Sequence, residues 1–375
     1  IAPGEPIPLG YMLVTSGENA NLGLDALGGI EIALADRDHS LLGHPLELVG
    51  ADSRCSSEGG EAAVQEILQT ENLVGIIGPS CSSAAIEAIP VISEAGLIMI
   101  SPSTTGPSLT NPDRYWQPGF FRTAHNDQYQ GSLAAEFARI ELGAKSAATI
   151  HDGSLYTDEL QKVFGDIFEQ LGGVITARTA IVEGETDMRA LLEFIGESQP
   201  DVLYFPIFEP EGNHIAKQAA DIPGLQNTIL IGADGLLTAT FAPQTGLSVV
   251  GMYLSGPYLE GPTYDNFLNK WEERFDDSPP SSFHAFAYDA TDILLNVIQN
   301  TAQLLPDGTL IIGRQALRDA VANINSYEGI SGSITCNQWG DCATGEALAM
   351  YRLIDEQVRG EFPPEAVWNK TIDSE

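Results

Sequence analysis

Basic residues are scarce in this chain of 375 residues. It has 17 lysines and arginines against 52 aspartates and glutamates, which gives a formal net charge of −35. The acidic residues are spread along the sequence instead of gathered in one tail. Charge repulsion therefore makes nucleic acid and anionic membrane surfaces poor partners. A heavily solvated acidic surface, which would suit a salty habitat, accounts for the same composition.

Long hydrophobic runs are also lacking. No apolar stretch approaches the roughly 20 residues that span a bilayer, so we expect no direct membrane span. The first ten residues, IAPGEPIPLG, have neither the charged start nor the apolar core of a secretory signal. We interpret them as a processed mature end or a spacer. With 43% hydrophobic residues the chain can bury sizeable cores, and its length predicts two domains.

The chain has only four cysteines, and the spacings typical of zinc ligands, such as Cys-x-x-Cys, are missing. We expect no metal and no cofactor. Cys336 and Cys342 enclose the turn sequence Asn-Gln-Trp-Gly-Asp, which predicts a small disulfide-closed hairpin. Cys55 and Cys81 each follow an expected strand, and they could bridge if both lie at the same edge of a sheet. Two disulfides would imply an oxidising, extracytoplasmic compartment.

Enzyme signatures are few. The sequence contains no G-x-S-x-G elbow, no P-loop and no G-x-G-x-x-G after a strand. His151 and Asp152 stand at a strand end, but neighbouring residues on a strand face opposite ways, which favours a structural role. The other five histidines are scattered. These absences predict that the protein is not an enzyme.

Strand and helix patterns alternate along most of the chain, which predicts doubly wound α/β architecture. The first series is strand 9–14, helix 24–36, strand 46–50, helix 58–70, strand 73–77, helix 86–95 and strand 97–100. The second series is helix 127–142, strand 146–150, helix 155–171, strand 174–182, helix 188–197, strand 202–207, helix 211–220 and strand 228–232.

The pattern after residue 251 is mainly helical and has no strand repeat of its own. We expect these helices to complete the first domain, so the chain would cross between domains more than once and form a hinge. The predicted domains are residues 1–122 plus 256–332 and residues 123–255 plus 333–375, with a ligand cleft between them.

Small hydroxyl residues follow two neighbouring strands of the first series. Ser80, Ser82 and Ser83 follow strand 73–77, and Ser101, Ser103, Thr104 and Thr105 follow strand 97–100. Ligands bind at the carboxyl edge of open parallel sheets, and hydroxyls beside a helix N-terminus suit a carboxylate. The alternative is that Ser82 only caps the helix and residues 101–105 form a polar turn.

The second series offers a complementary edge. Tyr156 follows strand 146–150, Phe208 and Glu209 follow strand 202–207, and Asp234 follows strand 228–232. One edge thus presents hydroxyls and helix N–H groups, and the other presents aromatic rings and a carboxylate. A zwitterion with an apolar side chain would suit both.

The sequence resembles the type I periplasmic solute-binding proteins of ABC importers, and among them the leucine/isoleucine/valine-binding proteins. Four motifs, which occur in the same order along the chain, carry this resemblance. They are Cys81-Ser-Ser83, Gly96-Leu-Ile-Met-Ile-Ser-Pro102 with Thr105, Ile150-His-Asp152 with Tyr156, and Gly232-Ala-Asp-Gly235. The resemblance implies two doubly wound α/β lobes joined by a multi-strand hinge. It extends over most of the chain and is strongest between residues 73 and 156.

The resemblance also implies roles for individual residues. Ser82 and Thr105 would hold the carboxylate and part of the ammonium of an amino acid, with Ser103 as a backbone contact and Thr104 beside them. Asp234 stands where the family has the glutamate that meets the ammonium, and Tyr156 matches a pocket tyrosine. A disulfide near the site corresponds to Cys55 and Cys81.

Three further positions depart from the family or align weakly with it. Leu22 replaces an aromatic residue near the first helix, Phe208 replaces a pocket tyrosine, and Tyr288 would add another aromatic ring. The acidic group is kept, so an α-amino acid is expected. The changed walls favour a neutral, branched-chain or small apolar side chain.

The resemblance implies an extracytoplasmic protein that captures an amino acid by lobe closure and delivers it to the transmembrane subunits of an ABC permease. We expect a monomer, periplasmic or extracellular, and lipid-anchored before processing. Two other classes stay open. One is a ligand-sensing receptor domain, or a binder of amides, urea or aromatic acids, with the same fold. The other is a secreted hydrolase centred on Ser82, which would need a base near that serine.

Overall fold

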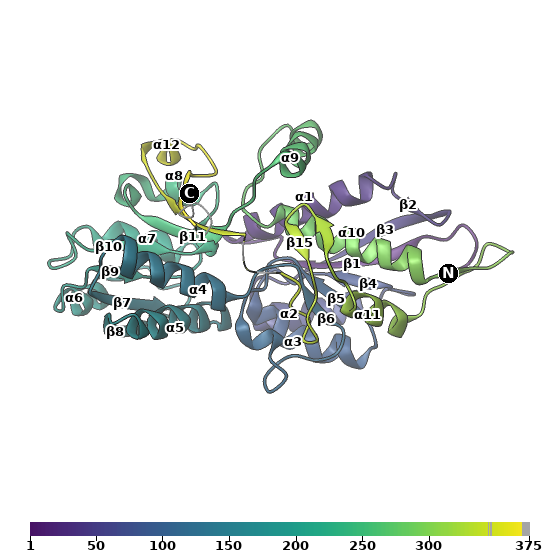
Figure 1. The fold of residues 1–375 in the computed structure, drawn as a ribbon, viewed down its shortest axis with the longest axis horizontal. Helices are drawn as coiled ribbons and strands as arrows, with labels where there is room; N and C mark the ends of the chain where they lie inside the picture. The colour runs from purple at the N-terminus through teal and green to yellow at the C-terminus, as the bar shows by residue number, and fades with distance from the viewer. Residues whose placement is uncertain (344, 346, 370–375) are drawn as a thin grey trace. The chain divides into compact units, whose positions relative to one another are not determined.

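A computed structural model describes residues 1–343, 345 and 347–369. The chain forms two compact α/β units and passes between them several times (Figure 1). Unit 1 comprises Ile1–Asn126, Leu259–Pro279 and Phe283–Thr344. Unit 2 comprises Asp127–Tyr258, Pro280–Ser282 and Gly345–Glu375. Both units are doubly wound, as predicted.

Unit 1 is built on a six-stranded sheet in the order β2-β3-β1-β4-β5-β6. All neighbours are parallel except the short β2, which pairs antiparallel with β3. The strands are β1 (Ile7–Leu13), β2 (Ser40–Leu41), β3 (His44–Asp52), β4 (Gly75–Ile77), β5 (Ile98–Ser101) and β6 (Phe120–Arg122). Two hairpins are added, β12 (Gln303–Leu304) with β13 (Leu310–Ile311) and β14 (Tyr327–Gly329) with β15 (Gly332–Ile334).

Helices cover both faces of this sheet. They are α1 (Ala20–Ala35), α2 (Ser57–Ile67), α3 (Ser82–Glu94), α9 (Pro262–Phe275), α10 (His284–Thr301) and α11 (Arg314–Ala322), with the short η1 (Pro107–Thr110). Successive side chains of β1 point to opposite faces of the sheet and show which helices cover each face. Leu9 packs in the core that includes α1 and α10, whereas Gly10 lies against Ile67 of α2. The helices after residue 259 complete the first sheet, as the sequence predicts.

Unit 2 is built on a seven-stranded sheet in the order β17-β16-β11-β10-β9-β7-β8. Strands β7 to β11 are parallel, and β16 and β17 add an antiparallel edge. The strands are β7 (Ser146–His151), β8 (Val174–Ala180), β9 (Val202–Tyr204), β10 (Ile229–Gly232), β11 (Tyr253–Pro257), β16 (Leu348–Arg352) and β17 (Ala366–Trp368).

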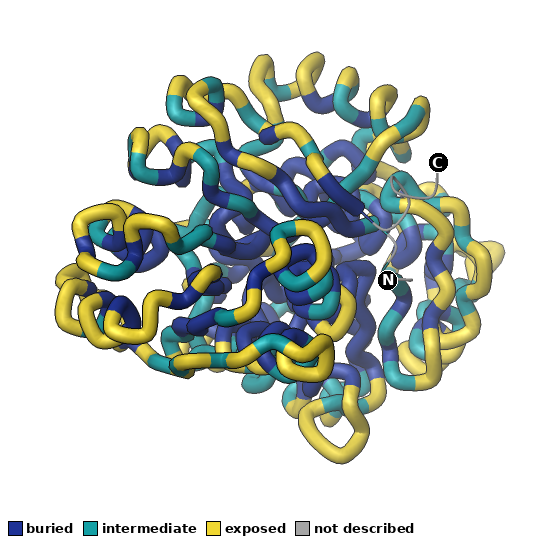
Figure 2. The backbone as a smooth tube through the Cα atoms, turned by 60° about the vertical axis from the view of Figure 1, so that its left-hand side comes forward, coloured by how far each residue is buried: buried dark blue, intermediate teal, exposed yellow. Residues whose placement is uncertain are grey.

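The helices of unit 2 are α4 (Asp127–Glu136), α5 (Leu155–Gln170), α6 (Arg189–Gly196), α7 (Glu211–Ala219), α8 (Phe241–Thr245) and α12 (Asp355–Val358), with η2 (Phe137–Glu141), η3 (Asp234–Leu236) and η4 (Gly246–Val249). Ala147 and Val202 face the core beneath α4 and α5, and the next residues, Ala148 and Leu203, face the core beneath α6 to α8. Figure 2 shows buried residues along the inner stretches of chain and exposed residues along the outer turns and loops.

The last boundary between the units differs from the predicted one. Residues 333–344 were expected in the second domain, but they group with unit 1. Backbone pairing explains this placement, because the N–H of Arg122 donates to the carbonyl of Gly340 at 2.9 Å and the N–H of Cys342 donates to the carbonyl of Arg122 at 3.1 Å. The loop closed by the Cys336–Cys342 disulfide therefore extends the sheet beside β6.

Candidate functional site

The hydroxyl residues of unit 1 lie at the point where the strand order of its sheet reverses. The central β1 has β3 on one side and β4 on the other, and such a reversal opens a crevice at the carboxyl ends of the strands. Ser80, just after β4, accepts a hydrogen bond from the N–H of Val14, just after β1, at 3.1 Å. Gly78 has a φ of +128°, and a Cβ there would lie 2.2 Å from the carbonyl oxygen of Met12. Only glycine permits this close approach.

Ser101 organises the loop that follows β5. Its buried Oγ donates to the carbonyl of Pro79 at 2.8 Å and accepts from the N–H groups of Ser103 and Thr104 at 3.3 and 3.0 Å. The Thr104 hydroxyl donates to the same oxygen at 2.7 Å, and the Ser103 hydroxyl donates to the carbonyl of Ser80 at 3.0 Å. Ser103 and Thr104 thus use their hydroxyl protons inside the protein, which is consistent with a backbone role for Ser103.

Ser82 is the first residue of α3, and the helix cap is the preceding Cys81, whose side chain makes no capping hydrogen bond. The alternative that Ser82 is only an N-cap therefore does not describe this helix. The Ser82 Oγ accepts from the N–H of Gly106 at 3.2 Å, and none of the described residues accepts its proton. Thr105, the residue before Gly106, is buried with it. The structure thus brings Ser82 and the 103–106 loop together beside the α3 N-terminus.

The Cys55–Cys81 disulfide is formed and ties the loop after β3 to the start of α3. Leu22 is buried in the first turn of α1, after the carboxyl end of β1. Tyr288 is placed differently, since its hydroxyl donates to Asp36 at 2.8 Å and its ring packs edge-on against Phe267. These partners belong to α1 and α9 and not to the hydroxyl cluster. The ligand contact expected for Tyr288 stays a prediction that no described contact supports.

Unit 2 places its predicted residues around a second reversal of strand order, between β7 and β9. Tyr156 follows β7, and its ring centroid lies 5.0 Å from that of Phe208, which follows β9. Asp234 begins η3, directly after β10. The Tyr156 hydroxyl donates to Asp234 Oδ1 at 2.7 Å and accepts from the N–H of Gly235 at 3.3 Å. Three separate strand ends therefore supply one cluster of two aromatic rings and a carboxylate.

Asp234 is 5% exposed, and its carboxylate is held from one side. Oδ1 accepts from Tyr156 and from Gln130 Nε2, the latter at 2.6 Å, whereas no side chain of the described residues donates to Oδ2. Burial raises the pKa of Asp234 above its ordinary value, and the hydrogen bonds from Tyr156 and Gln130 oppose that rise. A cation at Oδ2 would compensate the buried charge.

Gln130 was not anticipated from the sequence. It lies on α4, and its amide also donates to the carbonyl and hydroxyl of the buried Ser255 on β11, at 3.1 and 3.0 Å. It therefore fixes Asp234 to two other elements of unit 2. A polar residue in a helix gives no indication of a partner about a hundred residues away, and no local motif marks it.

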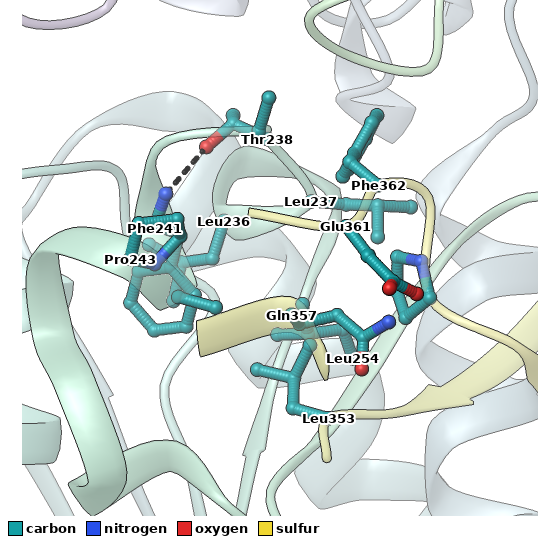
Figure 3. A pocket seen from close by; sticks show the side chains of 13 residues that line it. Leu236, Leu237, Thr238, Phe241, Pro243, Leu254, Leu353, Gln357, Glu361 and Phe362 are labelled. Atoms are coloured by element: carbon teal, nitrogen blue, oxygen red, sulfur yellow. Dashed lines mark hydrogen bonds between the residues drawn. The ribbon is translucent and has the colours of Figure 1, made fainter. Parts of the chain in front are cut away.

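Unit 2 also has a pocket lined by residues of η3, α8 and α12 and the segments beside them (Figure 3). Its enclosed volume is about 10 Å³, room for roughly one water molecule and far below that of a small-molecule site. Its lining is mainly apolar and includes Leu236, Leu237, Phe241 and Leu353. Leu236 and Leu237 lie two and three residues after Asp234, so this pocket borders the turn that carries the carboxylate.

Neither a metal centre nor a membrane helix is found in the described part of the chain. No group of three or more histidine, cysteine, aspartate or glutamate side chains there is arranged to hold an ion. No helix among the same residues is long and apolar enough to cross a bilayer.

Two doubly wound units, each with polar groups at its strand reversal, define a two-lobed α/β binding protein. Residues 6–355 match the sequence model of the periplasmic binding proteins, and the chain belongs to this family.

Individual relatives agree with this assignment. The chain is 29% identical over 233 residues to an amino acid binding protein of Pseudomonas aeruginosa, covering 62% of this chain and 61% of that protein. It is 26% identical over 259 residues to a Leu/Ile/Val-binding protein of Escherichia coli, covering 68% and 69%. The chain thus spans less than two thirds of the length of the first of these relatives. The crystal structure of a leucine-binding protein from Thermotoga maritima matches with a TM-score of 0.85 at 24% identity, covering 97% and 99%, which establishes the fold.

Proposed function

We propose that the protein is an extracytoplasmic solute-binding protein that captures a neutral, branched-chain or small apolar amino acid for an ABC importer. The observation that carries this proposal is the carboxylate of Asp234, which is buried, anchored through Oδ1 and open to a donor at Oδ2. Such a group calls for a cationic partner, and the α-ammonium of an amino acid is one.

The hydroxyl cluster of unit 1 suits the carboxylate end of the amino acid. The Ser82 hydroxyl has a proton to donate, and the first N–H groups of the 13-residue α3 have no partner within the helix. Both features favour a carboxylate. Phe208 and Leu22 offer apolar walls, and no arginine or lysine belongs to either predicted half-site, which disfavours an acidic side chain. We propose that the ligand bridges the two half-sites and stabilises a closed arrangement of the two units.

Replacing Asp234 tests the proposal directly. A hydrogen bond to a charged group contributes about 1.5 to 3 kcal/mol, so Asp234→Asn should weaken L-leucine binding by roughly tenfold to over a hundredfold in calorimetry. The matched control is Asp221→Asn, which changes an exposed carboxylate of the same unit and should leave the affinity unchanged. Equal affinity of the Asp234 variant and the wild type would rule out the assigned ammonium site.

The ligand itself offers a second comparison. 4-Methylpentanoate is L-leucine without the amino group, so its binding should be weak and should not weaken further in Asp234→Asn. A screen of the twenty amino acids, urea, short amides and aromatic acids by thermal shift would identify the side-chain class. Tight binding of an uncharged amide and of no amino acid would favour the amide-binding alternative.

The proposed role has further parts that do not depend on the geometry of the site. Delivery to the transmembrane subunits of a permease, a monomeric state and a periplasmic or extracellular location, with lipid anchoring before processing, complete the proposed role. A sensor domain with the same ligand would show the same binding, and transport assays in cells lacking this protein would separate the two. The hydrolase alternative lacks support, because no imidazole or carboxylate of the described residues contacts the Ser82 hydroxyl.

A further inference from the structure

We propose that the ion pair between the buried Arg122 and the partly buried Asp341 is the positioning element of the carboxylate half-site, which holds the loop 104–110 so that Thr105 and Ser82 can meet the ligand. This inference rests on the proposed function for the identity of the ligand. The ordering of the loop by the ion pair can be tested without any ligand.

Arg122 ends β6 and is fully buried. Its Nη1 donates to the carbonyl of Thr104 at 3.1 Å and to that of Gly106 at 2.9 Å, and its Nη2 donates to the hydroxyl of Thr110 at 2.9 Å. One guanidinium therefore holds the backbone on both sides of Thr105. Because Gly106 in turn donates its N–H to Ser82 Oγ, the same side chain also fixes the partner of Ser82.

The guanidinium is not available to the ligand. Its Nε donates to Asp341 Oδ1, and each of its two terminal nitrogens donates to the loop. Oδ2 of Asp341 accepts from the Thr110 hydroxyl at 2.8 Å and from Asn126 Nδ2 at 3.1 Å. Burial raises the pKa of Asp341, but the charge of Arg122 and the three hydrogen bonds outweigh it and keep the pKa below its usual value. Arg122 therefore acts through the backbone of the loop and not as a direct carboxylate ligand.

Asp341 is itself held in place by the disulfide loop. It lies inside the ring closed by Cys336 and Cys342, and this ring pairs with β6 through Gly340 and Cys342. Gly340 has a φ of +82°, and a Cβ there would lie 2.3 Å from the carbonyl oxygen of Phe120. A continuous series of contacts thus connects the second disulfide to the hydroxyl cluster, and all of its residues belong to unit 1.

The test removes both charges together, because deleting one would leave the other buried and unpaired. The variant Arg122→Met with Asp341→Leu keeps similar side-chain volumes. Asp341→Asn is a second variant, which keeps an amide oxygen as acceptor for Arg122 Nε but leaves the buried guanidinium charge uncompensated. The control is Arg318→Met, which removes another arginine of unit 1 that donates to the carbonyls of Ile92, Ser93 and Leu97, at the far end of α3.

The first measurement is hydrogen–deuterium exchange of the peptide spanning residues 103–110 without ligand. We expect at least tenfold faster exchange there in the Arg122/Asp341 variant, faster exchange also in Asp341→Asn, and wild-type exchange in Arg318→Met. Wild-type exchange of this peptide in the charge-free variant, or an equal increase throughout unit 1, would overturn the proposal.

The second measurement compares L-leucine with L-leucinamide, which lacks the carboxylate. The charge-free variant should lose roughly tenfold or more in affinity for L-leucine and less than about threefold for the amide. An equal loss for both ligands would indicate a general structural role and overturn the positioning role. If the wild type binds neither compound, the proposed function fails, and the exchange measurement still decides whether the ion pair orders the loop.

Discussion

The hydroxyl of Tyr156 stabilises the charged form of Asp234 and so opposes the rise in its pKa that burial causes. Burial raises the pKa of Tyr156 well above 10, and the nearby charges of Asp234 and Asp127 raise it further. The phenol therefore keeps its proton at neutral pH and donates it to Asp234. Gln130 contributes a second donor that does not titrate.

Tyr156→Phe should therefore make ligand binding more sensitive to acid. The loss of one donor raises the pKa of Asp234 further, so a larger fraction of the carboxyl is neutral as pH falls. We expect L-leucine to bind about tenfold more weakly at pH 7, with a steeper decline towards pH 5.5 than in the wild type. Calorimetry at several pH values measures both effects.

The control for this variant is Tyr253→Phe. Tyr253 is a partly buried tyrosine of the same unit whose ring packs on Phe137 at 5.0 Å. The pH dependence of L-leucine binding to the Tyr253→Phe variant should match that of the wild type. A Tyr156 variant with a reduced affinity but an unchanged pH profile would mean that Tyr156 supports the shape of the site and not the charge of Asp234.

At this scale, the sequence predicts the residues that stand directly after strands. Ser82 and Thr105 follow parallel strands of the first sheet, and Tyr156 and Asp234 follow parallel strands of the second, so each pair lies at the carboxyl edge of its own sheet. Gln130 could not be predicted in the same way, because its importance comes from contacts with residues distant along the chain. Tyr288 was assigned through a weak alignment with the family; its hydroxyl donates to Asp36, and its contact with a ligand stays a prediction.

The turn between β14 and β15 is attached to α10 through the carboxylate of Asp289, and Tyr327 of β14 donates to a second carboxylate of that helix, Asp292. Asp289 is 1% exposed and accepts from the N–H groups of Ile330 and Ser331, both at 2.8 Å, and from the Ser331 hydroxyl at 2.5 Å. Burial raises its pKa to about 6, although these hydrogen bonds lower it. The folded pKa thus exceeds the unfolded value of about 3.9, so this group stabilises the fold below pH ~4 and loses that contribution as pH rises through about 6.

Asp289→Asn removes this titration. The wild type should lose stability relative to the variant between pH ~4 and pH ~7, by on the order of 2 to 3 kcal/mol, which corresponds to about two pKa units. Urea unfolding at several pH values measures the difference. Asp277→Asn, at an exposed position of unit 1, is the control and should differ from the wild type by a nearly constant amount. A constant difference for Asp289→Asn as well would contradict the assigned cause.

Elements with strong local patterns were predicted well, and those fixed by distant pairing were not. The alternating strands and helices of both sheets have clear apolar periods, so their order was predictable. The segment 333–344 has turn residues and few apolar ones, and its place beside β6 depends on backbone hydrogen bonds to Arg122. Nothing in its local sequence indicates that partner.

For the whole molecule, the charge balance opposes any step that brings acidic surfaces closer. The net charge of −35 is spread along the chain, so closure of the two units would bring like charges together. A zwitterionic ligand adds no net charge and cannot reduce this repulsion by itself. Salt reduces this repulsion, because the electrostatic screening length falls from about 30 Å at 0.01 M to about 8 Å at 0.15 M ionic strength. Ligand affinity should therefore rise with ionic strength over this range.

Solution scattering tests the proposed closure. Saturating L-leucine should reduce the radius of gyration of the wild type at 0.15 M salt, because a ligand held by groups from both units favours the state in which both contact it. The Asp234→Asn variant, mixed with the same concentration of L-leucine, should keep its ligand-free curve. Calorimetry on the same samples confirms that the wild type is saturated. Identical curves for the saturated and ligand-free wild type would show that binding occurs without closure, and one half-site would then have to hold the amino acid alone.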